Sequence, residues 1–210
     1  VGSINLNASK IKSQSELVNP FIDSVIDSKV NHFDIPVMEL CDQLFEKKEF
    51  QAIKSLYQSH PYQFWNGIYY LIHAKGSSVV RYFILNCLEN VDVHIYGPDD
   101  WGKENFIFHG NIPYGRELSA VYQKHAIHLN IHSLQLETSI NNRVFDVFAS
   151  GGFVLSDYRK DMEKIFPQYW EYITFRNLSE LGEKGDYYLT HEKERKELAQ
   201  ELHQHIISRH

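Results

Sequence analysis

The chain has 210 residues, 43% hydrophobic and 14% aromatic, which is enough apolar side chain for one substantial core. Its formal net charge of −6, without any basic block, argues against a nucleic-acid-binding protein. We find no apolar run of the roughly 18 residues that a membrane span needs, and no signal peptide. Cys41 and Cys87 lie in apolar helical patterns without the spacing of a metal site, so we expect reduced cysteines in a cytoplasmic protein.

The first part of the chain, from about residue 9 to residue 76, has the spacing of apolar residues that is typical of helices. Asn19-Pro20 supplies a helix cap and a first turn. We expect three or four helices here. Their buried faces carry Phe21, Ile22, Val25, Ile26, Val37, Leu40, Cys41, Leu44, Phe45, Phe50, Ile53, Leu56 and Tyr57.

A cluster of aromatic residues follows His60-Pro61, and it consists of Tyr62, Phe64, Trp65, Tyr69 and Tyr70. Aromatic rings commonly contact sugars, so a platform for a carbohydrate is one interpretation. We favour core packing of the helical zone, because buried aromatic side chains dominate protein cores.

From Ser77 onward, helical and strand patterns alternate, as in a parallel sheet that helices cover on both faces. The expected strands are Val91–Ile95, Phe106–Phe108, Ile127–Ile131, Phe153–Ser156 and Tyr172–Phe175. The expected helices contain Val79–Leu88, Leu118–Tyr122, Val144–Ala149 and Met162–Phe166, and two more follow, the last with a buried stripe of Leu198, Leu202 and Ile206. The predicted fold class is therefore α/β, with an additional N-terminal helical region.

The ends of the strands are the first place to look for a ligand site. In open α/β sheets, ligands bind beyond the carboxyl ends of the strands. The residues that we place at such ends are Gly2, Ser3, Gly97, Pro98, Gly110, His132 and Asp157. His132 is either a polar contact to a ligand or a histidine satisfied by loop backbone.

The stretch from Asn141 to Asp157 is the centre of the sequence, because it predicts a helix, a tight turn at Gly151-Gly152 and a buried strand. Asn141 or Asn142 can cap the helix. The free N–H groups and the positive dipole end of the helix would attract a phosphate there.

Arg143 and Asp146 lie three residues apart, so they share one face of this helix. Together they offer a cation for diphosphate oxygens and a carboxylate for sugar hydroxyls. The alternative is an intrahelical ion pair on a solvated face, worth a few tenths of a kcal/mol.

Other chemistries find little support in the sequence. No Gly-x-Gly-x-x-Gly follows a strand and no Walker lysine motif is present, which argues against a dehydrogenase or a P-loop enzyme. The chain has 12 histidines, but His128 and His132, on one face of a strand, lie about 13 Å apart, too far to bind one ion. We therefore expect no metal and no cofactor.

Three motifs carry a family resemblance: Arg-Val-Phe-Asp-x-x-Ala-x-Gly-Gly-x-x-Leu-x-Asp at 143–157, Tyr-Gly-Pro at 96–98 and Leu-Asn-Ile-His at 129–132. They resemble the bacterial glycosyltransferases similar to spore maturation protein CgeB. The resemblance runs from about Ser77 to the end of the chain. Such proteins have the two-domain GT-B architecture, and the matching part is the C-terminal domain. That family usually has Glu where this chain has Asp146, a side chain one methylene shorter.

The resemblance implies a division of the chain. Residues 77–210 would form a Rossmann-like domain that binds a nucleotide sugar, residues 9–76 a helical insertion, and residues 1–8 the first strand and loop of the nucleotide-binding domain. Val1-Gly2-Ser3 matches the end of that strand in the family, so the chain would be an excised domain. A vector-derived remnant is the alternative interpretation.

The implied function is glycosyl transfer, with a nucleoside-diphosphate sugar as donor substrate and an unknown glycan, protein or lipid-linked acceptor. The catalytic residues stay unassigned, because an acceptor-side base would lie in a separate N-terminal domain of the same protein. A non-catalytic module that binds a nucleotide or a protein partner is the second hypothesis. The residues expected to contact the donor are Gly2, Ser3, Gly97, Pro98, His132, Asn141, Asn142, Arg143, Asp146 and Gly151.

Overall fold

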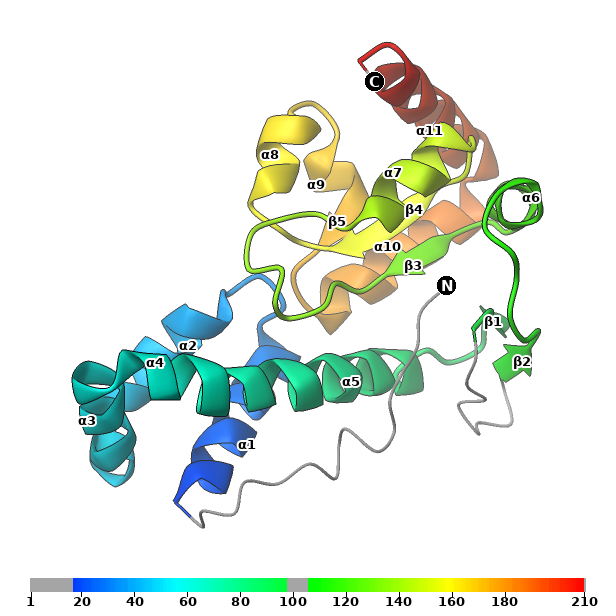
Figure 1. The fold of residues 1–210 in the computed structure, drawn as a ribbon. Helices are drawn as coiled ribbons and strands as arrows, with labels where there is room; N and C mark the ends of the chain where they lie inside the picture. The colour runs from blue at the N-terminus through cyan, green and yellow to red at the C-terminus, as the bar shows by residue number, and fades with distance from the viewer. Residues whose placement is uncertain (1–16, 98–105, 210) are drawn as a thin grey trace.

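The structure is a computed structural model that describes residues 17–97 and 106–209. It is a mixed α/β protein whose strands are parallel and whose helices lie on both sides of them (Figure 1). The strand predicted at the start of the chain lies outside the described residues. The expected fold class is therefore confirmed at the level of α/β with parallel strands.

The N-terminal part is a layer of helices, as predicted. It contains α1 (Val18–Asn31), α2 (Val37–Phe45), the 3₁₀ turn η2 (Lys48–Phe50), α3 (Gln51–Ser59), the short α4 (Pro61–Gln63), the π-helix η3 (Phe64–Tyr69) and α5 (Tyr70–Asn86). Phe21 of α1 is fully buried and stacks on Phe45 of α2 with ring centroids 5.4 Å apart. The helical periodicity of the sequence thus reports a real apolar core in this layer.

Helix α5 joins this layer to the rest of the molecule. It runs without a break across the boundary predicted after residue 76, and Figure 1 shows it extending from the helical layer toward β1. A side chain at Gly76 would place its Cβ 2.6 Å from Leu134, in the loop after β3. The Ser77 hydroxyl accepts a hydrogen bond from the Leu134 amide at 3.0 Å. Close packing of α5 on that loop therefore fixes the two parts together.

The strands of the described residues lie in two sheets, whereas the sequence predicts one. The strands β1 (Val93–Ile95) and β2 (Phe106–Phe108) pair in parallel, and β3 (His128–Asn130), β4 (Val154–Asp157) and β5 (Thr174–Phe175) form the second sheet in that order. All these strands coincide with expected ones except β5. Tyr172 and Ile173 belong to α9, because helical bonding continues through Ile173.

The remaining helices follow the predicted alternation. They are α6 (Arg116–Lys124), α7 (Asn142–Ala149), α8 (Asp161–Ile165), α9 (Trp170–Ile173), α10 (Leu178–Thr190) and α11 (Glu192–Ile207). In α11, Leu202 and Ile206 are buried and Leu198 partly so, which confirms the predicted stripe. Among the described residues, none of the helices combines the length and apolar character that crossing a membrane requires.

Candidate functional site

Polar side chains gather at the carboxyl ends of β3 and β4. Asn130 ends β3 and stands opposite Ser156 of β4 in the parallel register. Both residues are fully buried, and the Asn130 amide donates to the Ser156 hydroxyl at 2.9 Å. The Asn130 carbonyl oxygen in turn accepts from the Asn141 amide at 3.0 Å and from Arg143 at 3.4 Å. The polar side chain of Asn130, in an otherwise apolar strand, therefore connects the sheet to the start of α7.

Arg143 lies in the first turn of α7 and is partly buried, and Asn130 is its hydrogen-bond partner in the described structure. No carboxylate of the described residues lies within ion-pair distance of it. Burial lowers the pKa of the Arg143 guanidinium, and the nearby positive charge of Arg81 lowers this pKa further. Arg81, from α5, donates to the carbonyl of Ile131 at 3.3 Å. Two neighbouring cations that are partly shielded from water favour an anion between or beside them.

Both arginines line a cavity of about 460 Å³ between β1 and β3. Its lining combines apolar side chains of the strands with rings, among them Tyr96, Tyr122, His125 and His128, and it includes the carboxylates of Glu89, Asp92 and Asp186. Burial lowers the pKa of His128 to about 4, so this ring is neutral at pH 7. The size and mixed lining suit a small organic anion.

The start of α7 has hydrogen-bonding capacity that the protein does not use. Asn141 is the N-cap residue, with φ −79° and ψ 160°, but its side chain makes no capping hydrogen bond. Its Oδ1 atom is buried without a partner in the described structure. Asn142 is exposed at the first helical position. An anion at this end would meet uncapped backbone N–H groups and the positive end of the helix dipole.

Asp146 does not pair with Arg143, so the intrahelical ion pair is absent from the described structure. Its carboxylate instead accepts a hydrogen bond from the hydroxyl of Tyr114 at 3.0 Å. Tyr114 precedes α6 and is exposed. The Asp146 carboxylate thus faces the loop before α6 and stays accessible to a polar ligand.

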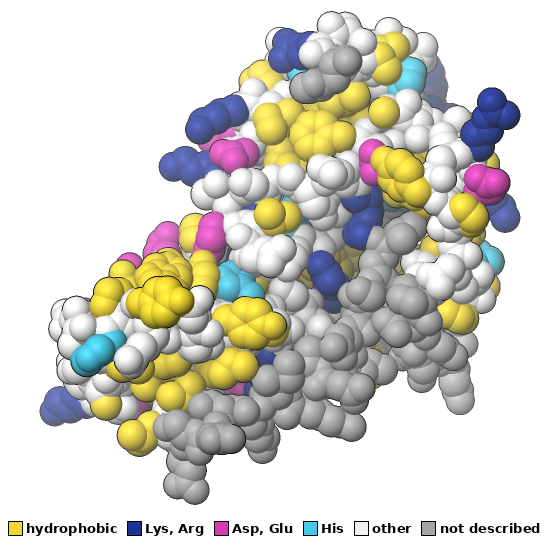
Figure 2. Space-filling model, viewed as in Figure 1, with side chains coloured by type: hydrophobic (Ala, Val, Ile, Leu, Met, Phe, Trp, Pro, Cys, Tyr) yellow, Lys and Arg dark blue, Asp and Glu magenta, His cyan; other side chains and the backbone are white. Residues whose placement is uncertain are grey.

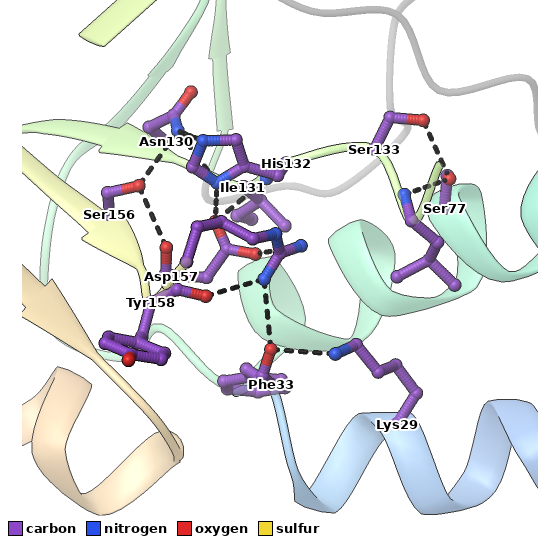
Figure 3. A network of polar contacts seen from close by, with 12 residues as sticks. Lys29, Phe33, Ser77, Asn130, Ile131, His132, Ser133, Ser156, Asp157 and Tyr158 are labelled. Atoms are coloured by element: carbon purple, nitrogen blue, oxygen red, sulfur yellow. Dashed lines mark hydrogen bonds and ion pairs between the residues drawn. The ribbon is translucent and has the colours of Figure 1, made fainter. Parts of the chain in front are cut away.

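His132 belongs to a second polar cluster, shown in Figure 3, which is closed. Its Nδ1 lies 2.6 Å from Asp157 Oδ1, and its side chain is entirely buried. The other Asp157 oxygen pairs with Arg159 at 2.9 Å, and Arg159 and Lys29 both donate to the carbonyl of Phe33, at 3.0 and 2.8 Å. His132 therefore exposes no atom to a donor. The expected ligand contact is corrected to a structural one, in which the partner of the ring is a carboxylate and not loop backbone.

Burial sets the protonation of this closed cluster. Burial lowers the pKa of His132, against the opposing effect of Asp157, so the ring is neutral. The pKa of Asp157 is low in spite of burial, because Arg159 and His132 stabilise the carboxylate. Burial lowers the pKa of Lys29 to about 7. The carboxylate of Asp157 is thus paired with the guanidinium of Arg159, while Lys29, which donates to the Phe33 carbonyl, is only partly protonated at pH 7.

The glycines predicted to contact the donor lie either away from the start of α7 or outside the described residues. The Gly97 amide donates to the Gly110 carbonyl at 2.9 Å and joins the ends of β1 and β2. Gly151, with φ +80°, follows the C-cap of α7, a helix about 12 Å long, so it does not share the site at the helix start. Gly2, Ser3 and Pro98 lie outside the described residues.

Several residues of the two clusters escaped the sequence reasoning: Arg81, Tyr114, Asn130, Ser156, Arg159 and Lys29. A signal exists for three of them. Asn130 and Ser156 are polar residues within short apolar strands, and Arg81 interrupts an apolar helical face between Val80 and Phe83. A polar residue at a position that periodicity predicts to be buried indicates a specific partner. Lys29, Arg159 and Tyr114 offered no such local signal.

Comparison with known proteins adds one match. A family model described as "Glycosyl transferase-like" matches residues 81–210. No curated protein and no solved structure matches the chain. The matched range begins at Arg81 and includes Asn130, Asn141, Arg143 and Asp146.

Proposed function

The chain belongs to the glycosyl transferase-like family, and from this membership we propose that it binds the nucleoside diphosphate of a sugar donor at the start of α7. We infer further that it is the C-terminal, donor-binding domain of a GT-B enzyme similar to the CgeB-like glycosyltransferases. The acceptor-side base would then be supplied by another domain of the same protein.

The observation that carries this proposal is the pair of neighbouring, partly buried guanidiniums of Arg143 and Arg81. No carboxylate of the described residues lies within ion-pair distance of Arg143, although even partial burial of a cation without a close counter-ion is costly. A diphosphate supplies the missing negative charge. It would accept hydrogen bonds from Arg143 and from the free N–H groups of α7, in the orientation that a planar guanidinium favours.

The same contacts account for the chemistry of transfer. As the bond between sugar and phosphate breaks, negative charge grows on the leaving diphosphate. A fixed cation and a helix N-terminus stabilise that charge without rearrangement, so the protein can supply what a metal ion supplies in other enzymes. Arg143 would hold the phosphate nearest the bond that breaks, and Asp146 would accept hydrogen bonds from ribose hydroxyls.

Isothermal titration calorimetry tests the proposal with nucleoside diphosphates of uracil, guanine and adenine, and with the corresponding nucleosides. The Arg143→Ala variant should lose about 1.5–3 kcal/mol of diphosphate binding while nucleoside binding stays nearly constant. The Arg209→Ala variant removes an exposed guanidinium after α11 and serves as the matched control. Circular dichroism establishes that both variants are folded.

Equal weakening of diphosphate and nucleoside would place Arg143 away from the phosphates. Wild-type protein that binds none of these compounds would remove the donor site altogether. Binding by this chain without sugar transfer by the intact protein would favour the non-catalytic module.

A further inference from the structure

The predicted aromatic cluster is only partly core. Phe64 is fully buried, whereas Tyr62, Trp65 and Tyr70 are 79%, 38% and 64% exposed. Figure 2 shows hydrophobic side chains gathered on this part of the helical layer, over α3, α4 and the start of α5. We call Tyr62, Trp65, Tyr69 and Tyr70 the aromatic ridge. Exposed aromatic side chains at such density indicate a binding surface.

The rings of the ridge are held in place from below. Tyr62, Trp65 and Tyr69 are spaced by three and four residues, so they lie along one side of the segment. Trp65 packs edge-on against Tyr69 with centroids 4.3 Å apart, and buried Phe64 supports Trp65 at 5.9 Å. The π-helix Phe64–Tyr69 widens the backbone here, and such widened turns are frequent at functional sites. The rings of Trp65 and Tyr69 are therefore held in place by their neighbours in the free protein.

The inner end of the ridge contacts the loop that leads to the proposed donor site. The Tyr69 hydroxyl donates to Glu137, whose other oxygen accepts from the Val37 amide at 2.6 Å. Glu137 stands four residues before Asn141, the N-cap of α7. A long ligand on the ridge would thus point along this loop toward the start of α7.

A second observation marks the same place. His73 packs against the Tyr69 ring with centroids 4.1 Å apart, and neither of its buried ring nitrogens has a partner in the described structure. A buried polar group without a partner costs free energy, so it calls for a reason beyond folding. A ligand hydroxyl or a bridging water at the inner end of the ridge would provide the missing partner.

The composition of the ridge selects its ligand. Residues 61–74 contain no Lys, Arg, Asp or Glu, which argues against binding to anionic lipids through this segment. Gln63 and Asn66 are exposed beside the rings and offer amide donors and acceptors. Flat aromatic faces with neutral hydrogen-bonding groups match the C–H faces and hydroxyls of pyranose rings. Tyr62 and Tyr69 lie about 10 Å apart along the helix, which gives room for more than one sugar unit.

We propose that the aromatic ridge binds a carbohydrate chain, which is the acceptor of the proposed transfer. This inference rests on the proposed function in one respect only, the identity of the carbohydrate as acceptor. The exposed rings of Tyr62 and Trp65 stack on sugar units, and the chain end approaches the donor past Glu137.

The test is a titration with four oligosaccharides of different linkage: maltopentaose, cellopentaose, chitopentaose and mannopentaose. Isothermal titration calorimetry measures their affinity for the wild type and three variants. Trp65→Ala should lower the affinity for the oligosaccharide that binds by about tenfold, whereas Trp65→Phe should retain most of the affinity. Tyr172→Ala removes an aromatic ring that is 56% exposed on α9 and should change nothing.

The outcomes separate the two proposals, because nucleoside diphosphate binding is measured on the same samples. Failure of all four oligosaccharides to bind the wild type overturns the ridge proposal and leaves the donor site standing. Oligosaccharide affinity that survives Trp65→Ala overturns the ridge proposal as well. Oligosaccharide binding that depends on Trp65, in a protein that does not bind nucleoside diphosphates, supports the ridge and overturns the donor site.

Discussion

Two polar clusters lie next to each other where β3 and β4 end, and they differ in the balance of charge. The closed cluster of His132, Asp157 and Arg159 pairs its carboxylate with a guanidinium and a neutral imidazole. The open cluster consists of Arg81, Asn130, Asn141 and Arg143. No described carboxylate lies within ion-pair distance of Arg143, and one Asn141 oxygen lacks a partner in the described structure.

This contrast shows how burial alone misleads a search for function. Both clusters contain buried polar side chains and groups with perturbed pKa values, and both stand at strand ends. The open cluster is the one that is incomplete without a ligand, because no described carboxylate lies within ion-pair distance of Arg143. Charge balance within a cluster therefore separates residues that hold the fold from residues that await an anion.

The largest effect is expected from breaking the closed cluster. Asp157→Asn keeps the shape of the side chain but leaves Arg159 buried without its counter-charge, so the free energy of unfolding should fall by about 3–5 kcal/mol. Urea denaturation measures this. In the open cluster, Arg143→Ala should change the free energy of unfolding by less than about 1 kcal/mol, since it removes one of two neighbouring cations. Equal losses in the two variants would erase the distinction.

The proposed contact between Asp146, on the same helix as Arg143, and a ribose can be tested by mutation. If its carboxylate accepts hydrogen bonds from ribose hydroxyls, Asp146→Asn should weaken ribonucleotide binding by about 1.5–3 kcal/mol and leave 2′,3′-dideoxy analogues nearly unaffected. Tyr114→Phe removes the present hydrogen bond to Asp146 without changing the carboxylate, and it should retain ribonucleotide binding. Unchanged affinity of Asp146→Asn for both ligand types would remove the ribose contact from the proposal.

Acid separates the two clusters further because it acts on one of them only. Burial lowers the folded-state pKa of His132, so below the ordinary value of about 6.5 the unfolded state binds a proton that the folded state does not. Stability should therefore decrease as the pH falls, by up to about 1.4 kcal/mol per pH unit from this residue, and further below the ordinary aspartate value of about 3.9, because the folded-state pKa of Asp157 is lowered. Arginines stay charged throughout. Urea denaturation at pH 7, 6 and 5 should give a smaller slope for His132→Asn than for the wild type, and an identical slope would refute this assignment.

The sequence alone predicted the secondary structure correctly where it depends on residues that are close together in the chain. The strand Phe106–Phe108 and the helix Asn142–Ala149 lie where spacing and glycine punctuation placed them. It failed at Tyr172 and Ile173, where β-branched and aromatic residues favoured a strand but helical bonding from Tyr169 prevailed. Local preference alone does not decide between two such outcomes.

The site depends more on contacts between distant parts of the chain. Arg159 donates to a carbonyl 126 residues earlier, and no spacing rule connects those positions. Arg143 was expected from its place in a predicted helix start. Its neighbour Arg81 was not, because only the packing of α5 on the residues that follow β3 brings the two charges together.

Helix α5 has a consequence for the way this protein can change by recombination. Its 17 residues form a helix about 25 Å long, which begins at Tyr70 of the aromatic ridge and carries Arg81 in its second half. Because a helix transmits any shift in its phase, inserting one residue within it would rotate Arg81 by about 100° relative to His73. A recombination event inside α5 would thus keep both sites in register only if it left the number of residues in the helix unchanged. We therefore expect the helical layer and the anion site to evolve together.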